Sequence, residues 1–360
     1  MLGAFGWNRL LTQPGGDYES GVFDLRSPSP RPTALAGMVS SFSKGKTFEH
    51  PLLKQKGWWQ KESRFIHPPV GYEAVYDGFP ATQPLLIIGK NGMLGRAFGL
   101  ICQQRGIKFR ILSRQEMDIC DPKSIENILN IYRPWAIVNA AGYTRIDSAE
   151  LEPQKCFNDN VLGVKNLADA CKQNGIRLLT FSSAMVFDGT KSSPYLESDP
   201  VAPLNIYGKS KAEAENVVLQ ADCQALVIRT GWFFSPWKQP DFIHHILTDM
   251  NNNYAPVCPE DVVISPTYVP DLVQMALDLL IDEESGLWHL TNQGEFSWAA
   301  LTNEVVQRRK QYPKHFAVGP GQLLNWQAPR PLYSALGSER GNFMPPFEQA
   351  LDRYFSGIKV

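Results

Sequence analysis

The stretch that decides the fold is Leu85-Leu86-Ile87-Ile88-Gly89-Lys90-Asn91-Gly92-Met93-Leu94-Gly95. Its four leading apolar residues predict a buried strand, and apolar residues then recur at helical spacing from Met93 to Ile101. The three glycines therefore stand between a strand and a helix. There the first permits a tight turn, the second lets a pyrophosphate approach backbone N–H groups, and the third lets helix and strand pack closely. We interpret Gly89, Gly92 and Gly95 as a dinucleotide-binding turn; the alternative is that they only turn the chain.

Strand and helix signals continue to alternate downstream of this turn. Strands are predicted at residues 107–112, 136–141, 178–182 and 225–230, and helices at 121–132, 156–174 and 210–219. This alternation predicts an α/β protein with a doubly wound parallel sheet of the Rossmann type.

The same pattern suggests a division of the chain into three parts. We expect an NAD(P)-binding Rossmann domain at 85–230, followed at 231–360 by a smaller substrate-binding lobe with segments that return to the Rossmann domain. Residues 1–84 are rich in proline and glycine and carry no sustained period. We expect an irregular N-terminal extension there, with one helix over residues 31–42 whose apolar side includes Leu35, Met38 and Val39.

Composition argues against several classes of protein. Of the 360 residues, 43% are hydrophobic and 20% charged, and the formal net charge is -1. Without a strong field of either sign, nucleic acid and anionic membranes are not expected partners. The apolar runs are far shorter than the roughly 20 residues that a bilayer crossing requires. The six cysteines are scattered without a C-x-x-C pair, so we expect reduced thiols, no metal site and a cytoplasmic location.

The choice of cofactor should be visible at the end of the second strand, where a carboxylate would bind the ribose of NAD. This strand ends instead in Ser113-Arg114. A guanidinium matches a 2′-phosphate in charge and geometry, so we expect NADPH, with NADH as the alternative and Asp118 as an adenine-side contact. The structural alternative makes Arg114 a solvated surface residue.

A proton-transfer set is suggested by Tyr207 and Lys211, which lie four residues apart on one face of a predicted helix. An ammonium near a phenol favours the phenolate and eases proton exchange with a substrate oxygen. The pair Ser182-Ser183 ends the strand after Gly175, at the carboxyl edge of the sheet where cofactor and substrate meet. A serine there could bind a carbonyl and the tyrosine hydroxyl together. The alternative is a core tyrosine beside a surface lysine.

From about residue 84 onward the chain resembles the dTDP-4-dehydrorhamnose reductases and their RmlD-type relatives among the extended short-chain dehydrogenases. Ordered matches carry this resemblance in addition to the glycine turn. They are Asp118 to Asp121, Asn139 to Thr144 with Asp147 and Glu150, Asn160, Val186 to Gly189, Tyr207 to Lys211 with Glu215, Arg229 to Trp232, Ser265 to Thr267, His289 to Thr291, and Arg330-Pro331.

The resemblance implies hydride transfer from NADPH or NADH to C4 of a nucleotide-linked 4-keto-6-deoxy sugar. Tyr207 would supply the proton, Lys211 would hold the nicotinamide ribose, and Ser183 would orient the carbonyl. The implied cofactor contacts are Gly89, Asn91, Gly92, Met93, Leu94, Gly95, Ser113, Arg114, Asp118, Ile119, Ala140, Ala141, Tyr143, Asn160, Ser182, Tyr207 and Lys211; the implied substrate contacts are Val186, Trp232 and Arg330. A homodimer and a divalent ion are left open.

Two features keep other interpretations in view. The family usually carries an Asp-Tyr pair where this chain has Ala184-Met185, and a serine is more usual at Gly231. RmlD-type folds also serve as non-catalytic NADP-binding regulatory subunits, so that function is the main alternative. Epimerase or dehydratase chemistry is a further alternative.

The first 80 residues show a second resemblance, to the C-terminal tail of a family-1 β-glycosidase-type domain. It rests on the stretches Gly6 to Thr12, Gly21 to Arg26 and Arg31 to Leu35. No glycosidase acid-base pair can be assigned here.

Overall fold

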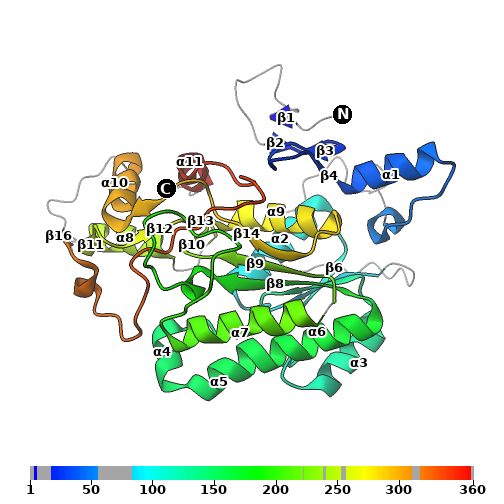
Figure 1. The fold of residues 1–360 in the computed structure, drawn as a ribbon, viewed down its shortest axis with the longest axis horizontal. Helices are drawn as coiled ribbons and strands as arrows, with labels where there is room; N and C mark the ends of the chain where they lie inside the picture. Colours follow the sequence, from blue (N-terminus) through cyan, green and yellow to red (C-terminus); the bar gives the residue numbers. More distant parts are fainter. Residues whose placement is uncertain are drawn as a thin grey trace.

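The computed structural model describes residues 4–5, 18–55, 83–221, 223–237, 241–252, 257–309 and 317–357. At its centre is a parallel sheet in the order β14-β9-β8-β7-β5-β6 (Figure 1). The strands are β5 (Leu85–Ile88), β6 (Phe109–Leu112), β7 (Ala136–Asn139), β8 (Arg177–Ser183), β9 (Ala225–Thr230) and β14 (Gly286–His289). The predicted doubly wound parallel sheet is confirmed.

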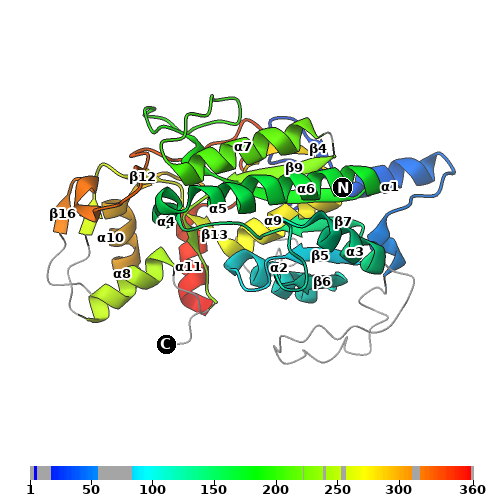
Figure 2. The same cartoon turned by 90° about the horizontal axis from the view of Figure 1, so that it is seen from below.

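Helices cover both faces of this sheet (Figures 1 and 2). On one face, α2 (Met93–Arg105) and α9 (Val269–Ile281) build a core with one set of alternating strand residues. On the other face, α3 (Pro122–Tyr132), α6 (Gly163–Asn174) and α7 (Ile206–Gln220) pack on the opposite set. Buried strands such as β5 are apolar throughout because both of their faces are covered.

The order of the strands locates the expected ligand crevice. From β5 the chain crosses to β6 on one side and then returns to β7 on the other side of β5. Ligands of such sheets bind where the order reverses, beyond the carboxyl ends of the strands. That point lies between Ile88 and Asn139, which are paired in register at the ends of β5 and β7.

The helix predicted over residues 156–174 contains one wider turn. The structure has α5 (Pro153–Phe157), a π-helical turn over Asn158–Leu162, and then α6. Residue periodicity does not reveal such a turn, because a single wider turn shifts the phase without ending the helix. Turns of this kind are often found at functional sites, and this one carries the fully buried Asn160.

A second cluster of elements follows β9. Its helices are α8 (Phe242–Asn251), α10 (Trp298–Arg309) and α11 (Phe347–Gly357). Short strand pairs accompany them: β10 (Phe233–Phe234) with β13 (Thr267–Tyr268), β11 (Val257–Pro259) with β16 (Ala317–Gly319), and β12 (Val263–Ile264) with β15 (Phe296–Ser297). An apolar core that includes Phe234 and Phe347 holds this lobe together. Between these segments, α9 and β14 return to the central sheet.

The N-terminal extension is more ordered than expected, and its helix differs from the prediction. Of the segments described there, β3 (Phe23–Asp24) pairs with β4 (Arg31–Pro32), and the helix α1 covers Ala34–Ser43. Pro32 therefore belongs to a strand and not to the first helical turn. The expected apolar side of α1 does not enter a core, because every residue of α1 is at least partly exposed, with Leu35 and Val39 46% and 51% accessible.

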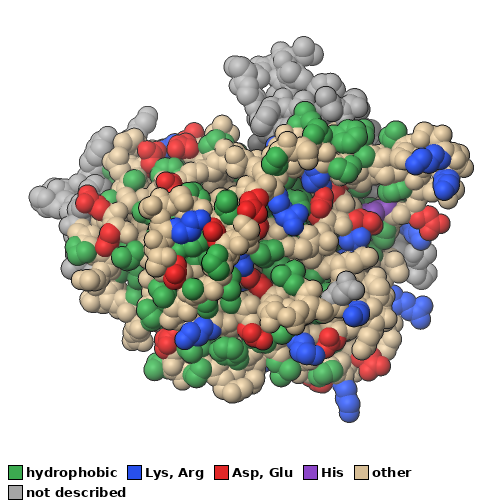
Figure 3. Space-filling model, viewed as in Figure 1, with side chains coloured by type: hydrophobic (Ala, Val, Ile, Leu, Met, Phe, Trp, Pro, Cys, Tyr) green, Lys and Arg blue, Asp and Glu red, His purple; other side chains and the backbone are tan. Residues whose placement is uncertain are grey.

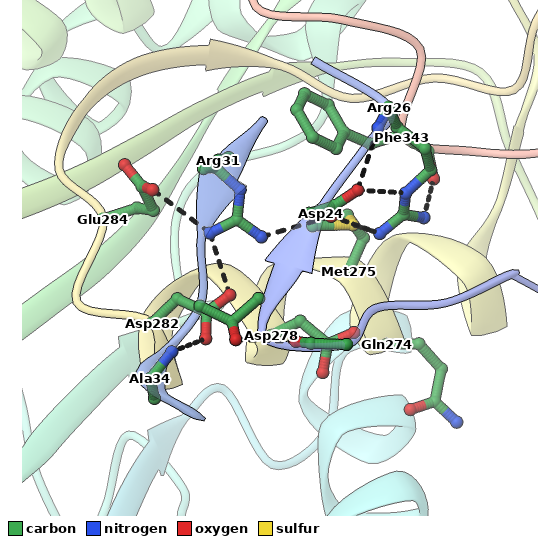
Figure 4. Close-up of polar contacts among 12 residues, drawn as sticks. Asp24, Arg26, Arg31, Ala34, Gln274, Met275, Asp278, Asp282, Glu284 and Phe343 are labelled. Atoms are coloured by element: carbon green, nitrogen blue, oxygen red, sulfur yellow. Dashed lines mark hydrogen bonds and ion pairs between the residues drawn. The ribbon is translucent and has the colours of Figure 1, made fainter. Parts of the chain in front are cut away.

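Polar contacts attach this extension to the rest of the molecule (Figure 4). Asp24 is fully buried and pairs with Arg26 and Arg31 at 2.8 and 3.2 Å. Arg31 also contacts Asp282 at 2.8 Å and Glu284 at 3.1 Å, just beyond the end of α9. Arg26 donates to the Phe343 carbonyl. Buried charges thus hold the β3–β4 pair in place, and α1 contributes no buried apolar face.

Three further observations bear on the expectations from composition. All six cysteines are present as thiols. On the face shown in Figure 3, basic and acidic side chains are interspersed over the surface. Within the part of the chain that the structure describes, no helix has the length and apolar character needed to span a membrane. The stretch Gly6 to Thr12, which carries part of the glycosidase-like pattern, lies outside the described residues.

Candidate active site

The glycine turn between β5 and α2 is tightly packed. Gly89 has a φ of 106°, and a Cβ there would lie 2.7 Å from the Ala140 carbonyl carbon at the end of β7. A Cβ on Gly95 would lie 2.1 Å from the Gly89 oxygen. Gly92 caps α2, and the first turn of a helix has N–H groups without partners inside the helix. This turn fits a pyrophosphate group, with Asn91, Met93 and Leu94 next to the same helix start.

The expected Ser-Tyr-Lys set is brought together at the carboxyl end of β8. Ser183 is the last residue of β8; its hydroxyl accepts from the Met185 N–H at 3.2 Å and interacts with Tyr207 on α7. The Lys211 ammonium donates to the Phe181 carbonyl at 3.2 Å and lies 5.8 Å from the centre of the Tyr207 ring. Close packing makes this possible, since a Cβ on Gly208 would lie 2.2 Å from the Met185 carbonyl oxygen.

Burial dominates the acid-base properties of this set. It raises the pKa of Tyr207 to about 12, an effect that the hydrogen bond from Ser183 only partly offsets. Burial also lowers the pKa of Lys211 to about 8, while Cys156 and Glu215 act in the opposite direction. The sequence argument expected the ammonium to favour the phenolate. Instead the phenol is held in its neutral, proton-bearing form, because both groups are removed from water.

A buried polar network places the loop after β7 against α7. The Asn160 side chain accepts from the Tyr143 N–H at 2.8 Å and donates to the Tyr143 carbonyl and to the Ser210 hydroxyl. The Tyr143 hydroxyl donates to Glu152 at 2.7 Å. Ala140 and Ala141 begin this loop, and the Ala140 backbone lies against Gly89 of the glycine turn.

The end of β6 is more strongly polar than its sequence suggested. Glu116 accepts from both the N–H and the hydroxyl of Ser113 at 2.9 Å and pairs with Arg110. Sequence reasoning missed this carboxylate because it comes four residues after the end of the strand. Arg114 lies between Asp118 and Asp159, at 3.4 and 3.2 Å.

Three expected cofactor or substrate contacts have side chains committed to other partners. The Ser182 hydroxyl donates to Glu215 inside the protein. Ile119 is buried against Gly163, and Val186 is fully buried in a cluster that includes Phe187. All three side chains are buried in this structure, and their roles as cofactor or substrate contacts stay predictions. Over such short segments, the alternation of polar and apolar residues could not predict which side chains point into the protein.

Trp232 and Arg330 lie at the junction of the sheet and the C-terminal lobe. Trp232 has a left-handed φ of 53°, which is unusual for a bulky residue. It packs both on the lobe core and on the cluster that contains Tyr207. Arg330 binds Asp147 through two hydrogen bonds of 2.8 Å and stacks on Trp326. Its guanidinium therefore ties the lobe to the loop after β7.

The residues at the departure from the family pattern are apolar and buried. Met185 packs with Tyr143, Cys156 and Tyr207, whereas Ala184 faces Gly231 and the neighbouring cluster. Neither side chain can replace the hydrogen bonds of a carboxylate or a phenol. The wall beside the Tyr207 hydroxyl is therefore apolar at this point.

Known proteins resemble this chain over most of its length. The family model for the RmlD substrate binding domain matches residues 83–357. A dTDP-4-dehydrorhamnose reductase of Aggregatibacter actinomycetemcomitans is 34% identical over 237 residues, which cover 62% of this chain and 80% of that protein. A reductase of the same name from Streptomyces griseus is 30% identical, covering 71% of this chain and 86% of that protein.

Solved structures agree as well. The dTDP-4-dehydrorhamnose reductase of Bacillus anthracis str. Ames, solved in complex with NADP, is 26% identical with a TM-score of 0.72. The match covers 77% of this chain and 99% of that one, and it therefore leaves about a quarter of the present chain without a counterpart. From the match to the family model and the similarity to these relatives, we conclude that the chain belongs to the RmlD substrate binding domain family.

Proposed function

We propose that this protein catalyses the NADPH-dependent reduction of the C4 keto group of a nucleotide-linked 4-keto-6-deoxy sugar. The observation that carries the proposal is the set Ser183, Tyr207 and Lys211 at the carboxyl edge of the sheet. Ser183 ends β8, the strand next to β7, and the other two residues lie on α7. The glycine turn lies two strands away, on β5. A proton donor and a pyrophosphate cradle on the same edge are what such a reduction needs.

Each residue of the set has a defined task in this mechanism. When bound, the nicotinamide cofactor supplies the hydride. Ser183 donates to the keto oxygen and orients it toward Tyr207, which delivers its proton to the developing alkoxide. A pKa of about 12 keeps Tyr207 protonated at neutral pH. With a pKa of about 8, Lys211 is mostly an ammonium at pH 7 and can bind ribose hydroxyls of the cofactor.

Preference for NADPH rests on Arg114. Its guanidinium is 61% exposed and lies beside the strand end where a 2′-phosphate would sit. Asp118 and Asp159 compete for that guanidinium. Binding of the phosphate would replace carboxylate contacts at an exposed site, which are individually weak. The NADP-bound relative supports the same choice.

The test is a spectrophotometric assay of NADPH oxidation with enzymatically generated dTDP-4-dehydrorhamnose. Tyr207→Phe should abolish turnover and leave NADPH affinity nearly unchanged, because only the phenolic hydroxyl is removed. Tyr132→Phe, outside the site on α3, is the matched control and should behave as wild type. Equal turnover in the wild-type and Tyr207→Phe proteins would refute the assigned proton donor.

The apolar Ala184-Met185 pair favours a second candidate, a non-catalytic NADP-binding subunit, since the hydrogen bonds that would hold a sugar are missing there. Tight NADPH binding by the wild-type protein without turnover of any 4-keto sugar would support this second function.

Four points stay predictions from the sequence: a cytoplasmic location, a homodimer, the three-part domain division and the glycosidase-like origin of the first 80 residues.

A further inference from the structure

A buried ion pair lies directly beneath the proposed catalytic set. Glu215 follows Lys211 by one turn of α7, and both of its carboxylate oxygens accept from Arg229, at 2.8 and 2.7 Å. The two side chains are only 6% and 4% exposed. Arg229 lies on β9, paired in register with Ser182 on β8, whose hydroxyl also donates to Glu215. The ion pair thus joins α7, β8 and β9 at one point.

Such a pair is poorly explained by stability alone. Removing two charges from water costs about as much as their attraction returns, and apolar residues of similar volume often stabilise a fold equally well. A buried pair placed next to a reactive group can serve another purpose, because its field acts on that group through a medium of low dielectric constant.

The pair continues into a chain of polar groups at β14. The Arg229 guanidinium contacts the His289 Nε2 at 3.3 Å. Because arginine can only donate, Nε2 accepts and Nδ1 carries the proton, which it donates to the Gly337 carbonyl at 2.8 Å. Burial also lowers the pKa of His289, so its ring is neutral. The Glu197 carboxylate accepts from the backbone N–H of His289 at 2.9 Å.

The groups that face Lys211 can therefore be enumerated by element. Tyr207 and Glu215 face it from α7, the Phe181 carbonyl from β8, the Cys156 thiol from α5, and Gly142 from the loop after β7. Of these groups, Glu215 is the carboxylate, and Arg229 behind it is its ion-pair partner.

We propose that Glu215 and Arg229 are positioning residues that act through Lys211: Glu215 favours its ammonium form, Arg229 limits that effect, and together they set the pH range in which the site works. This inference rests on the proposed reduction for its catalytic readout. A unit charge one helical turn away, at roughly 6 Å and an effective dielectric constant of about 20, moves a titration by about one to two pH units.

The test compares two single substitutions with opposite expected signs. Glu215→Gln removes the negative charge, so the high-pH limb of kcat/KM should move to lower pH by about one unit or more. Arg229→Gln leaves Glu215 uncompensated, so the same limb should move to higher pH. Glu215→Asp keeps the charge and should retain the wild-type midpoint. A purely structural defect would lower kcat without moving the midpoint in opposite directions.

A second readout does not require turnover. The pH dependence of NADPH affinity, measured by fluorescence titration, should shift in the same two directions, because the Lys211 ammonium binds the ribose. If wild type reduces no 4-keto sugar, this binding titration still decides the inference while the proposed function fails. If one variant does not fold, the sign of the other is still decisive. Unchanged midpoints, or shifts of the same sign in both variants, would overturn the proposal.

Discussion

Asp24→Asn should release the N-terminal extension while leaving the Rossmann-type sheet intact. The Asp24 carboxylate is fully buried and accepts from the Arg26 backbone N–H and side chain and from Arg31, over distances of 2.8 to 3.2 Å. Asparagine has one oxygen in place of two and presents an NH2 group to guanidinium donors. Arg26 and Arg31 would then both lose the negative charge of Asp24, and Arg31 would keep its contacts with Asp282 and Glu284.

The size of the effect follows from burial. Removing one partner of a buried ion pair costs about 3–5 kcal/mol. Every residue of α1 is at least partly exposed, so the helix adds little apolar packing that could compensate. The loss should therefore appear as local opening of residues 20–55 and not as global unfolding.

Hydrogen exchange provides the assay. Amides of residues 20–55 should exchange about 100-fold faster or more in Asp24→Asn, since every 1.4 kcal/mol is a factor of ten, while the β5 amides keep wild-type protection. The matched control is Asp169→Asn, which removes an exposed pair with Lys165 at 2.6 Å. That change should cost less than about 0.5 kcal/mol. Wild-type exchange of residues 20–55 in Asp24→Asn would refute the reasoning.

Three further outcomes are expected. Gly95→Ala should weaken NADPH binding at least about 10-fold, because its Cβ would lie 2.1 Å from the Gly89 oxygen. Gly99→Ala on the same helix would meet the Phe109 ring at 3.5 Å and Ile111 at 3.7 Å, which are ordinary contact distances, and should bind NADPH normally; isothermal titration separates the two variants. Asp147→Asn should destabilise the protein by about 1 kcal/mol at pH 7, a modest value because Asp147 is 41% exposed. Arg330 holds the pKa of Asp147 down to about 2, below its usual 3.8, so this contribution is complete above about pH 5 and is lost as the pH falls toward 2; urea unfolding of both proteins at pH 7 and pH 3 should show the difference shrinking. Arg114→Ala should raise the KM for NADPH about 10-fold and leave that for NADH unchanged, and equal effects on both would contradict the assigned 2′-phosphate contact.

The part of the candidate site that could be predicted from the sequence is the part that depends on short-range spacing. Ser183, Tyr207 and Lys211 could be grouped in advance, because an i,i+4 spacing and the end of a predicted strand both translate directly into position. Glu215 and Arg229 were visible only as parts of family motifs without a role, since their pairing joins a helix to a strand 14 residues away. Glu116 escaped notice because its contact with Ser113 depends on a turn.

By itself, the sequence determined the order of strands and helices, the parallel α/β class and the glycine turn, because apolar periodicity and glycine placement act over a few residues. Only the tertiary structure decided that β14 joins β9, that a π-helical turn carries Asn160, and that Arg31 is held by Asp282, 251 positions further along the chain. It also decided the protonation of Tyr207 and Lys211. Burial controls those groups, and burial is a property of segments that meet from distant parts of the chain, which no local pattern encodes.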